Sequence, residues 1–129
     1  MKNIIDIITK YGDVIDKCNK KELFNLLSYE VNFLDKGCIK SGELVNQIIY
    51  SIENNMKTMH HFYDFEDYNN KDMYINMKFE TKFYKIDNNY DNIEQINKGS
   101  CKFVFDKEFK IREIIIDNII EYDIIYKKK

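Results

Sequence analysis

One change of pattern along the chain restricts its fold more than any other feature. Up to about residue 58 most apolar residues recur at steps of three or four, whereas beyond it they alternate with polar residues. The first spacing lines one face of a helix and the second lines one face of a strand. Helices followed by a run of strands predict an α+β fold, in which the helices cover one face of a curved antiparallel sheet.

Three helices are predicted in the first half of the chain. They cover residues 3–18, a short segment that begins after Asn19, and residues 41–57. Asn19 and Glu22 have the spacing of a helix capping box. Gly12 lies inside the first helix, where a glycine marks close approach of another group or is merely tolerated at a cost of about 1 kcal/mol.

The strands are predicted from alternation and from turn residues. A short strand, Val31–Leu34, ends in Asp35, and a polar loop over residues 36–40 follows it. In the second half the expected strands are 59–65, 73–86, 96–106 and 109–116, with 117–126 either extending the last strand or forming a flap. A curved sheet closed by helices leaves a conical interior, which is a common ligand site.

Composition excludes several classes of function. The 129 residues fit one domain over 1–129, and a net charge of −2 with scattered basic residues argues against nucleic-acid binding. Three cysteines without CxxC spacing predict neither a disulfide framework nor a zinc site, and we expect no metal. Without a signal-peptide pattern or a long apolar run, we expect no membrane partner and a cytoplasmic location.

The order of elements and three motifs resemble the nuclear-transport-factor-2-like superfamily, which includes SnoaL-like polyketide cyclases, ketosteroid isomerases and scytalone dehydratase. The motifs are LFNLLSYEVNFLD, SGELVNQII and the closing hairpin GSCKFVFDKEFKI, in which Phe109 stands where the family usually has glycine. The resemblance implies a cystatin-like α+β cone barrel, with the curved sheet wrapped around three N-terminal helices. It does not imply one activity, because this fold supports many functions.

The resemblance also implies candidate catalytic residues. Ketosteroid isomerases carry a Tyr on the first helix, an Asp that ends the first strand and an Asp on a later strand, and these align with Tyr11, Asp35 and Cys101. Asp35 is a candidate general base or simply a turn acid, and Tyr11 is a candidate hydrogen-bond donor or a packing aromatic. Cys101 departs from the pattern, because a thiol donates a weaker hydrogen bond than a protonated carboxyl group.

His60 and His61 are further candidates, because SnoaL-like proteins often carry a pocket-facing His at the start of this strand. Adjacent residues of a strand point to opposite faces, so we expect at most one of the two to line the cone. Either could move a proton near neutral pH, or be a surface or packed residue. Four residues are expected to line the pocket or to be plain core: Phe79, Phe83, Cys101 and Phe103.

Two functions remain open at this stage. The first is a cofactor-independent isomerase, cyclase or dehydratase that moves a proton on a small apolar molecule. The second is a non-enzymatic module that binds a ligand or another protein. Tyr74, Tyr84 and Val104 on the outer sheet face, with the Ile-rich segment 114–125, suggest a surface covered by a partner, so we predict a homodimer through that face.

Overall fold

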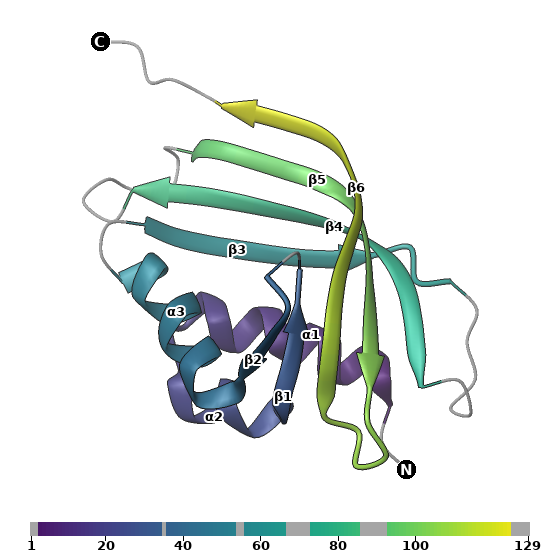
Figure 1. The fold of residues 1–129 in the computed structure, drawn as a ribbon. Helices are drawn as coiled ribbons and strands as arrows, with labels where there is room; N and C mark the ends of the chain where they lie inside the picture. The colour runs from purple at the N-terminus through teal and green to yellow at the C-terminus, as the bar shows by residue number, and fades with distance from the viewer. Residues whose placement is uncertain (1–2, 35, 54–55, 67–72, 86–92, 125–129) are drawn as a thin grey trace, which may run out of the picture.

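The computed structural model describes residues 3–34, 36–53, 56–66, 73–85 and 93–124. Within these ranges the chain forms three helices and a six-stranded sheet (Figure 1). In chain order the elements are α1 (Ile4–Asp16), α2 (Lys20–Leu26), β1 (Leu27–Phe33), β2 (Cys38–Lys40), α3 (Ser41–Glu53), β3 (Met56–Tyr63), β4 (Tyr74–Lys85), β5 (Ile93–Phe105) and β6 (Ile111–Ile124).

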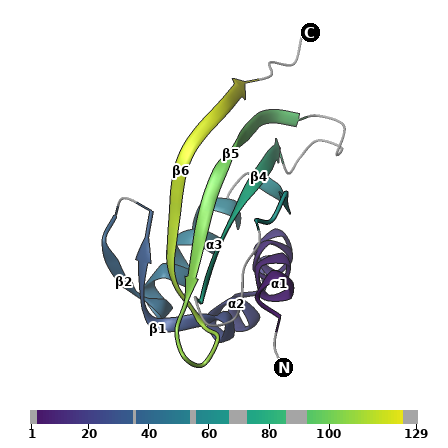
Figure 2. The same cartoon turned by 90° about the vertical axis from the view of Figure 1, so that its right-hand side faces the viewer.

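The sheet curves over the helices, which all lie on one side of it (Figures 1 and 2). The strand order is β2-β1-β6-β5-β4-β3, so the sheet is open, with β2 and β3 at its edges. This is the predicted α+β cone with a sheet wrapped around N-terminal helices. Among the described residues, no helix has the length and hydropathy that a membrane span needs.

The structure corrects two details of the predicted sheet. The sheet is not wholly antiparallel, because β1 runs parallel to β6. The predicted loop over 36–40 contains a strand, β2, which pairs antiparallel with β1. A strand of three residues is too short to show alternation, and pairing direction depends on contacts far apart in sequence. The last strand continues to Ile124, so the described part of the segment 117–126 extends this strand and does not form a flap.

Helix α1 and the concave sheet face share one hydrophobic core. The stripe of α1 is buried, and the inward residues of β4 and β5 pack opposite it. Each element thus buries the face that its period in the sequence predicts. The fully or almost fully buried members include Ile4, Ile8, Ile75, Met77, Phe103 and Phe105.

The β5–β6 hairpin is fixed by the carboxylate of Asp106. One oxygen, Oδ1, accepts hydrogen bonds from the backbone N–H groups of Glu108 (2.8 Å) and Lys110 (2.9 Å). The other oxygen, Oδ2, accepts from the hydroxyl of Ser28, near the start of β1. Partial burial acts to raise the pKa of Asp106, but the hydrogen bonds from Ser28, Lys110 and Glu108 outweigh it and lower that pKa.

Phe109 lies in the left-handed region of this hairpin, with φ of 63°. This is the position at which the sequence resemblance places a glycine, and a hairpin of this kind needs one residue with positive φ. An ordinary L-residue in this conformation costs about 1 kcal/mol or more. The Phe109 side chain packs against the hydrophobic core, and that contact offsets part of the strain.

We expect Asp106→Asn to lower the free energy of unfolding by about 1–2 kcal/mol at pH 7, because an amide accepts fewer and weaker hydrogen bonds. A lowered folded pKa adds stability that is complete above the unfolded pKa of about 4 and is lost as pH falls through the folded value. Urea unfolding of both proteins from pH 7 to pH 3 should therefore show their difference shrinking.

Glu108→Gln is the matched control for this prediction. Glu108 lies in the same turn and is exposed. Its substitution should leave the unfolding free energy within about 0.5 kcal/mol of the wild type. Equal losses in the two variants, or a pH-independent loss in Asp106→Asn, would show that the Asp106 carboxylate does not anchor the hairpin.

Candidate functional site

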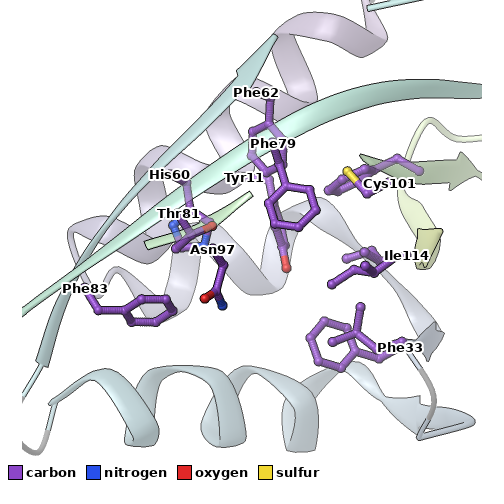
Figure 3. Close-up of a pocket in the computed structure, with 13 residues that line it drawn as sticks. Tyr11, Phe33, His60, Phe62, Phe79, Thr81, Phe83, Asn97, Cys101 and Ile114 are labelled. Carbon is purple, nitrogen blue, oxygen red and sulfur yellow. The ribbon is translucent and has the colours of Figure 1, made fainter. Parts of the chain in front are cut away.

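A cavity of about 240 Å³ lies between the concave sheet face, helix α1 and the end of β1 (Figure 3). Its walls are mostly aromatic and aliphatic, with a few polar side chains among them. The described lining residues are Tyr11, Phe33, Leu34, His60, Phe62, Phe79, Thr81, Phe83, Asn97, Cys101, Phe103, Ile114 and Ile116.

A second hollow of about 380 Å³ adjoins the first. The two share five lining residues: Tyr11, Phe33, Leu34, His60 and Phe83. The second hollow adds Ile15, Lys36, Gln47, Ile48 and Thr58, which come from α1, the β1–β2 turn, α3 and β3. Because the walls are shared, we treat the two as parts of one cavity, and we call the first hollow the inner part and the second the outer part.

The structure brings together most of the residues singled out in the sequence. Tyr11, His60, Phe79, Phe83, Cys101 and Phe103 all line the inner cavity. His61 does not: it lies on the other side of β3, exposed, and stacks on Tyr63 at 5.2 Å. Asp35 lies outside the described residues. Strand alternation thus separates the two histidines, and His60 is the one that faces the cavity.

His60 is held by Asp16, the last residue of α1. The ring Nδ1 lies 2.6 Å from Asp16 Oδ1, and the His60 backbone N–H donates to Oδ2 at 2.8 Å. The hydroxyl of Thr58 also donates to Asp16 Oδ1, at 2.7 Å. A carboxylate accepts hydrogen bonds, so Nδ1 is the donor of this contact, and the tautomer that matches it has its lone pair on Nε2.

This pair is partly shielded from water. The side chains of His60 and Asp16 are 18% and 20% exposed. Among the described residues, Nε2 of His60 has no hydrogen-bond partner, so it is available to a molecule in the cavity. A His whose tautomer and orientation are fixed by a carboxylate is the usual arrangement of a general base.

Gly12 makes the contact between α1 and β3 possible. A Cβ atom on Gly12 would lie 2.9 Å from His60 Cβ and 3.1 Å from Phe62 Cε2. Both distances are too short for ordinary packing, so only glycine permits this approach. Of the two readings of Gly12, the structure supports close approach.

Tyr11 contributes a hydroxyl to an otherwise aromatic wall. Its ring is only 6% exposed and meets the Phe103 ring edge to face at 5.3 Å. In Figure 3 the hydroxyl points into the space enclosed by the lining residues. Burial, and secondarily the neighbouring Cys101, raise the pKa of Tyr11 above its usual value. The phenol is therefore neutral near pH 7 and acts as a hydrogen-bond donor.

A polar row crosses the concave face at the level of His60. In the strand register His60 on β3 is opposite Thr81 on β4, and Thr81 is opposite Asn97 on β5. All three line the cavity, as Figure 3 shows. The Asn97 Oδ1 accepts from Gln95 Nε2 at 3.0 Å, which leaves its NH₂ group to face the cavity as a donor.

Cys101 faces the cavity as an inert wall residue. It is 3% exposed, and burial, together with the charge of Asp117, raises its pKa to about 12. Its thiol is therefore protonated at physiological pH and is a poor nucleophile.

Among the described residues, no group of three or more His, Cys, Asp or Glu side chains is placed to hold a metal ion.

Sequence reasoning missed Asp16 and Asn97. Asn97 lay in a segment predicted to be mostly loop, but β5 begins at Ile93. For Asp16 a signal was present: it follows Gly12 by four residues, so the two share a helix face. The glycine lets a strand pack close to the helix, and the acid one turn later can accept hydrogen bonds from that strand.

Comparison with solved structures identifies the fold. A nuclear-transport-factor-2-like protein of unknown function from Exiguobacterium matches with a TM-score of 0.63 and 13% identity, over 85% of this chain and 95% of that one. A Methylobium petroleophilum protein of unknown function with a cystatin-like fold matches with a TM-score of 0.68 and 11% identity, over 92% and 76%.

An enzyme is also among the structures that resemble this chain. The epoxide hydrolase/cyclase-like enzyme SalBIII, which acts in pyran ring formation in salinomycin, matches with a TM-score of 0.64 and 9% identity, over 88% of each chain. No protein-family model and no curated protein sequence matches the chain. The chain therefore has the nuclear-transport-factor-2-like, cystatin-like fold that its motifs suggested, and these identities establish the fold alone.

We expect overpacking in Gly12→Ala to lower the free energy of unfolding by about 1–3 kcal/mol. The better helix propensity of Ala should offset about 1 kcal/mol of this loss. Gly42→Ala in α3 is the matched control, because outside its own helix the nearest described atom to an added Cβ is Phe24 Cε1, at 4.0 Å. That variant should be neutral or slightly stabilised. Chemical unfolding of both variants measures the difference, and an equal response would show that α1 does not need glycine at this contact.

Proposed function

We propose that this protein binds a small, largely apolar molecule in the cavity and catalyses a cofactor-independent proton transfer on it, as an isomerase, cyclase or dehydratase does. The observation that supports this most directly is the Asp16–His60 pair, with Nε2 of His60 left free beside an apolar cavity. The structural resemblance to a cyclase-like enzyme is consistent with this chemistry. Tyr11 supplies the neutral donor that such a reaction needs.

The proposed step removes a proton from a carbon next to a carbonyl group. His60 Nε2 takes the proton, the electron pair of the C–H bond moves toward the carbonyl oxygen, and an enol or enolate forms. Asp16 accepts a hydrogen bond from Nδ1 and stabilises the imidazolium that results. In a β,γ-unsaturated substrate the product is a dienol or dienolate, and return of the proton to its γ-carbon would complete an isomerisation.

The remaining polar groups suit the oxygen of the substrate. The Tyr11 hydroxyl donates to an oxyanion from α1, while the amide of Asn97 offers a donor from the sheet. Donors that are already in place when charge develops lower the barrier without reorganisation. The phenyl rings around them exclude water, which strengthens each of these hydrogen bonds.

A non-enzymatic carrier is the second candidate. It is favoured by Cys101, which stands where the ketosteroid-isomerase pattern has an acid and whose thiol stays neutral. The carrier would use the same cavity and the same donors, but without a proton-transfer step. The experiment below separates the two.

We expect the wild-type protein to accelerate exchange of the α-protons of 2-tetralone, a bicyclic ketone, in deuterium oxide, as followed by NMR. His60→Gln should slow the protein-dependent exchange by about 10²-fold or more, because the base is lost. Asp16→Asn should also slow it, because the orienting carboxylate is lost. His61→Gln is the matched control and should exchange as the wild type does, because His61 lies outside the cavity.

Binding of the ketone is measured alongside by changes in amide chemical shifts. Binding without exchange above the buffer rate would support the carrier and reject the enzyme. Equal exchange rates in His60→Gln and the wild type would remove His60 as the base. Absence of both binding and exchange across a panel of bicyclic ketones and esters would reject the cavity as a small-molecule site.

The homodimer through the outer sheet face remains a prediction. Tyr84 and Val104, which suggested it, are already buried within the chain, but Tyr74 (40% exposed) and Met59 (49% exposed) still present apolar surface there. We expect light scattering at micromolar concentration to give twice the mass of one chain, and Tyr74→Lys to lower that mass. A wild-type mass equal to one chain would reject the dimer.

A further inference from the structure

We infer that the ligand of this cavity is an amphipathic anion, with an apolar ring system in the inner part and a carboxylate or similar anionic group at Lys36 in the outer part. This inference rests on the proposed small-molecule site and adds the chemical class of its ligand. It follows from how polar and charged groups are distributed along the cavity.

The inner part offers contacts suited to a flat apolar body. Phe62 and Phe103 meet edge to face at 5.6 Å, and Tyr11 packs against Phe103 in the same manner. Phe79 and Ile114 complete the wall, and neither is more than 7% exposed. A volume of about 240 Å³ is suited to one or two fused rings.

The outer part differs in charge. The described lining of the outer part includes Lys36 and Gln47, which do not line the inner part. His60 lines both parts. Among the described lining residues of both parts, Lys36 and His60 are the side chains that can carry positive charge, and no Asp or Glu is among them. An anionic group therefore meets a cation and an amide donor, and it stays partly hydrated there because Lys36 and Gln47 are both exposed.

The position of Lys36 is set by the backbone of the β1–β2 turn. The Lys36 N–H donates to the Phe33 carbonyl at 3.0 Å, and the Phe33 N–H donates to the Gly37 carbonyl at 3.1 Å. Leu34 N–H donates to the Ile114 carbonyl at 2.8 Å, which attaches the turn to β6. Gly37 supplies the positive φ, 80°, that closes the turn. Lys36 is therefore presented to the cavity by a hydrogen-bonded turn.

The test compares an anion with a neutral molecule of the same shape, 2-naphthoate with 2-naphthamide, by isothermal titration calorimetry at low salt. We expect the wild type to bind naphthoate about threefold to tenfold more tightly, as one exposed charge contact allows. Lys36→Met should abolish this preference, because it should lower the affinity for naphthoate more than the affinity for naphthamide. Lys36→Arg should retain it.

Lys40→Met is the matched control. Lys40 is an exposed lysine four residues further along, with its Nζ 5.7 Å from the centroid of the Tyr29 ring, and it lines neither part of the cavity. This variant should keep the full preference for naphthoate. Raising the salt concentration should reduce the preference in the wild type, since an exposed charge is screened.

Two outcomes would overturn the inference of an anionic ligand without affecting the proposed small-molecule site. The first is equal binding of both compounds by the wild type. The second is a preference for naphthoate that persists in Lys36→Met. Both leave the small-molecule site intact, because naphthamide still binds. If the wild type binds neither compound, the inference and the proposed small-molecule site fail together.

Discussion

The contact between the carboxyl end of α1 and strand β3 organises the functional part of this molecule. Asp16 accepts three hydrogen bonds from this strand, two from His60 and one from Thr58. They join α1 to β3, which is an edge strand: in the described part of the chain no further strand pairs with its outward N–H groups. One carboxylate thus caps an exposed strand edge and fixes the orientation of a cavity histidine.

The same contact sets the depth of the cavity. Gly12 lets α1 approach β3 until no room is left for a Cβ atom, and this approach brings the Tyr11 ring against Phe103. The long strands β4–β6 curve over the helices (Figure 1), and the hollows beneath them are lined by residues of α1 and α3 as well as of the sheet. A tight helix contact at one end of the sheet and an open sheet at the other leave adjoining hollows between the helices and the concave sheet face.

The polar groups of the cavity come from separate segments, and each is positioned by its backbone. His60, Thr81 and Asn97 form a row because strand register places them opposite one another. Lys36 lines the outer part of the cavity, in the turn with Gly37 that joins β1 to β2. A cavity with an apolar wall, a row of polar side chains and one lysine accepts ligands that combine an apolar body with an anionic group. This combination connects the proposed proton transfer to the proposed anionic ligand.

The sequence by itself determined the classes of element and the faces that they bury. The apolar period of 3.6 in α1, the period of two in β4 and the capping at Asn19 are local properties, and the structure confirms each. Alternation also predicted that His60 and His61 would lie on opposite sides of β3. The family motifs predicted the cone-shaped fold, including the hairpin in which Phe109 takes a glycine conformation.

Only the tertiary structure decided which of these residues meet. Asp16 and His60 are 44 positions apart, and Asn97 joins them through two strand pairings. The parallel pairing of β1 with β6 and the short strand β2 also depend on distant partners. The periodicity of a sequence indicates whether a side chain points toward the core, but it does not indicate which side chain it contacts there. That contact depends on strand register, sheet curvature and the distance at which a helix packs. The site is therefore a property of the packing, whereas the core that supports it can be read from the sequence.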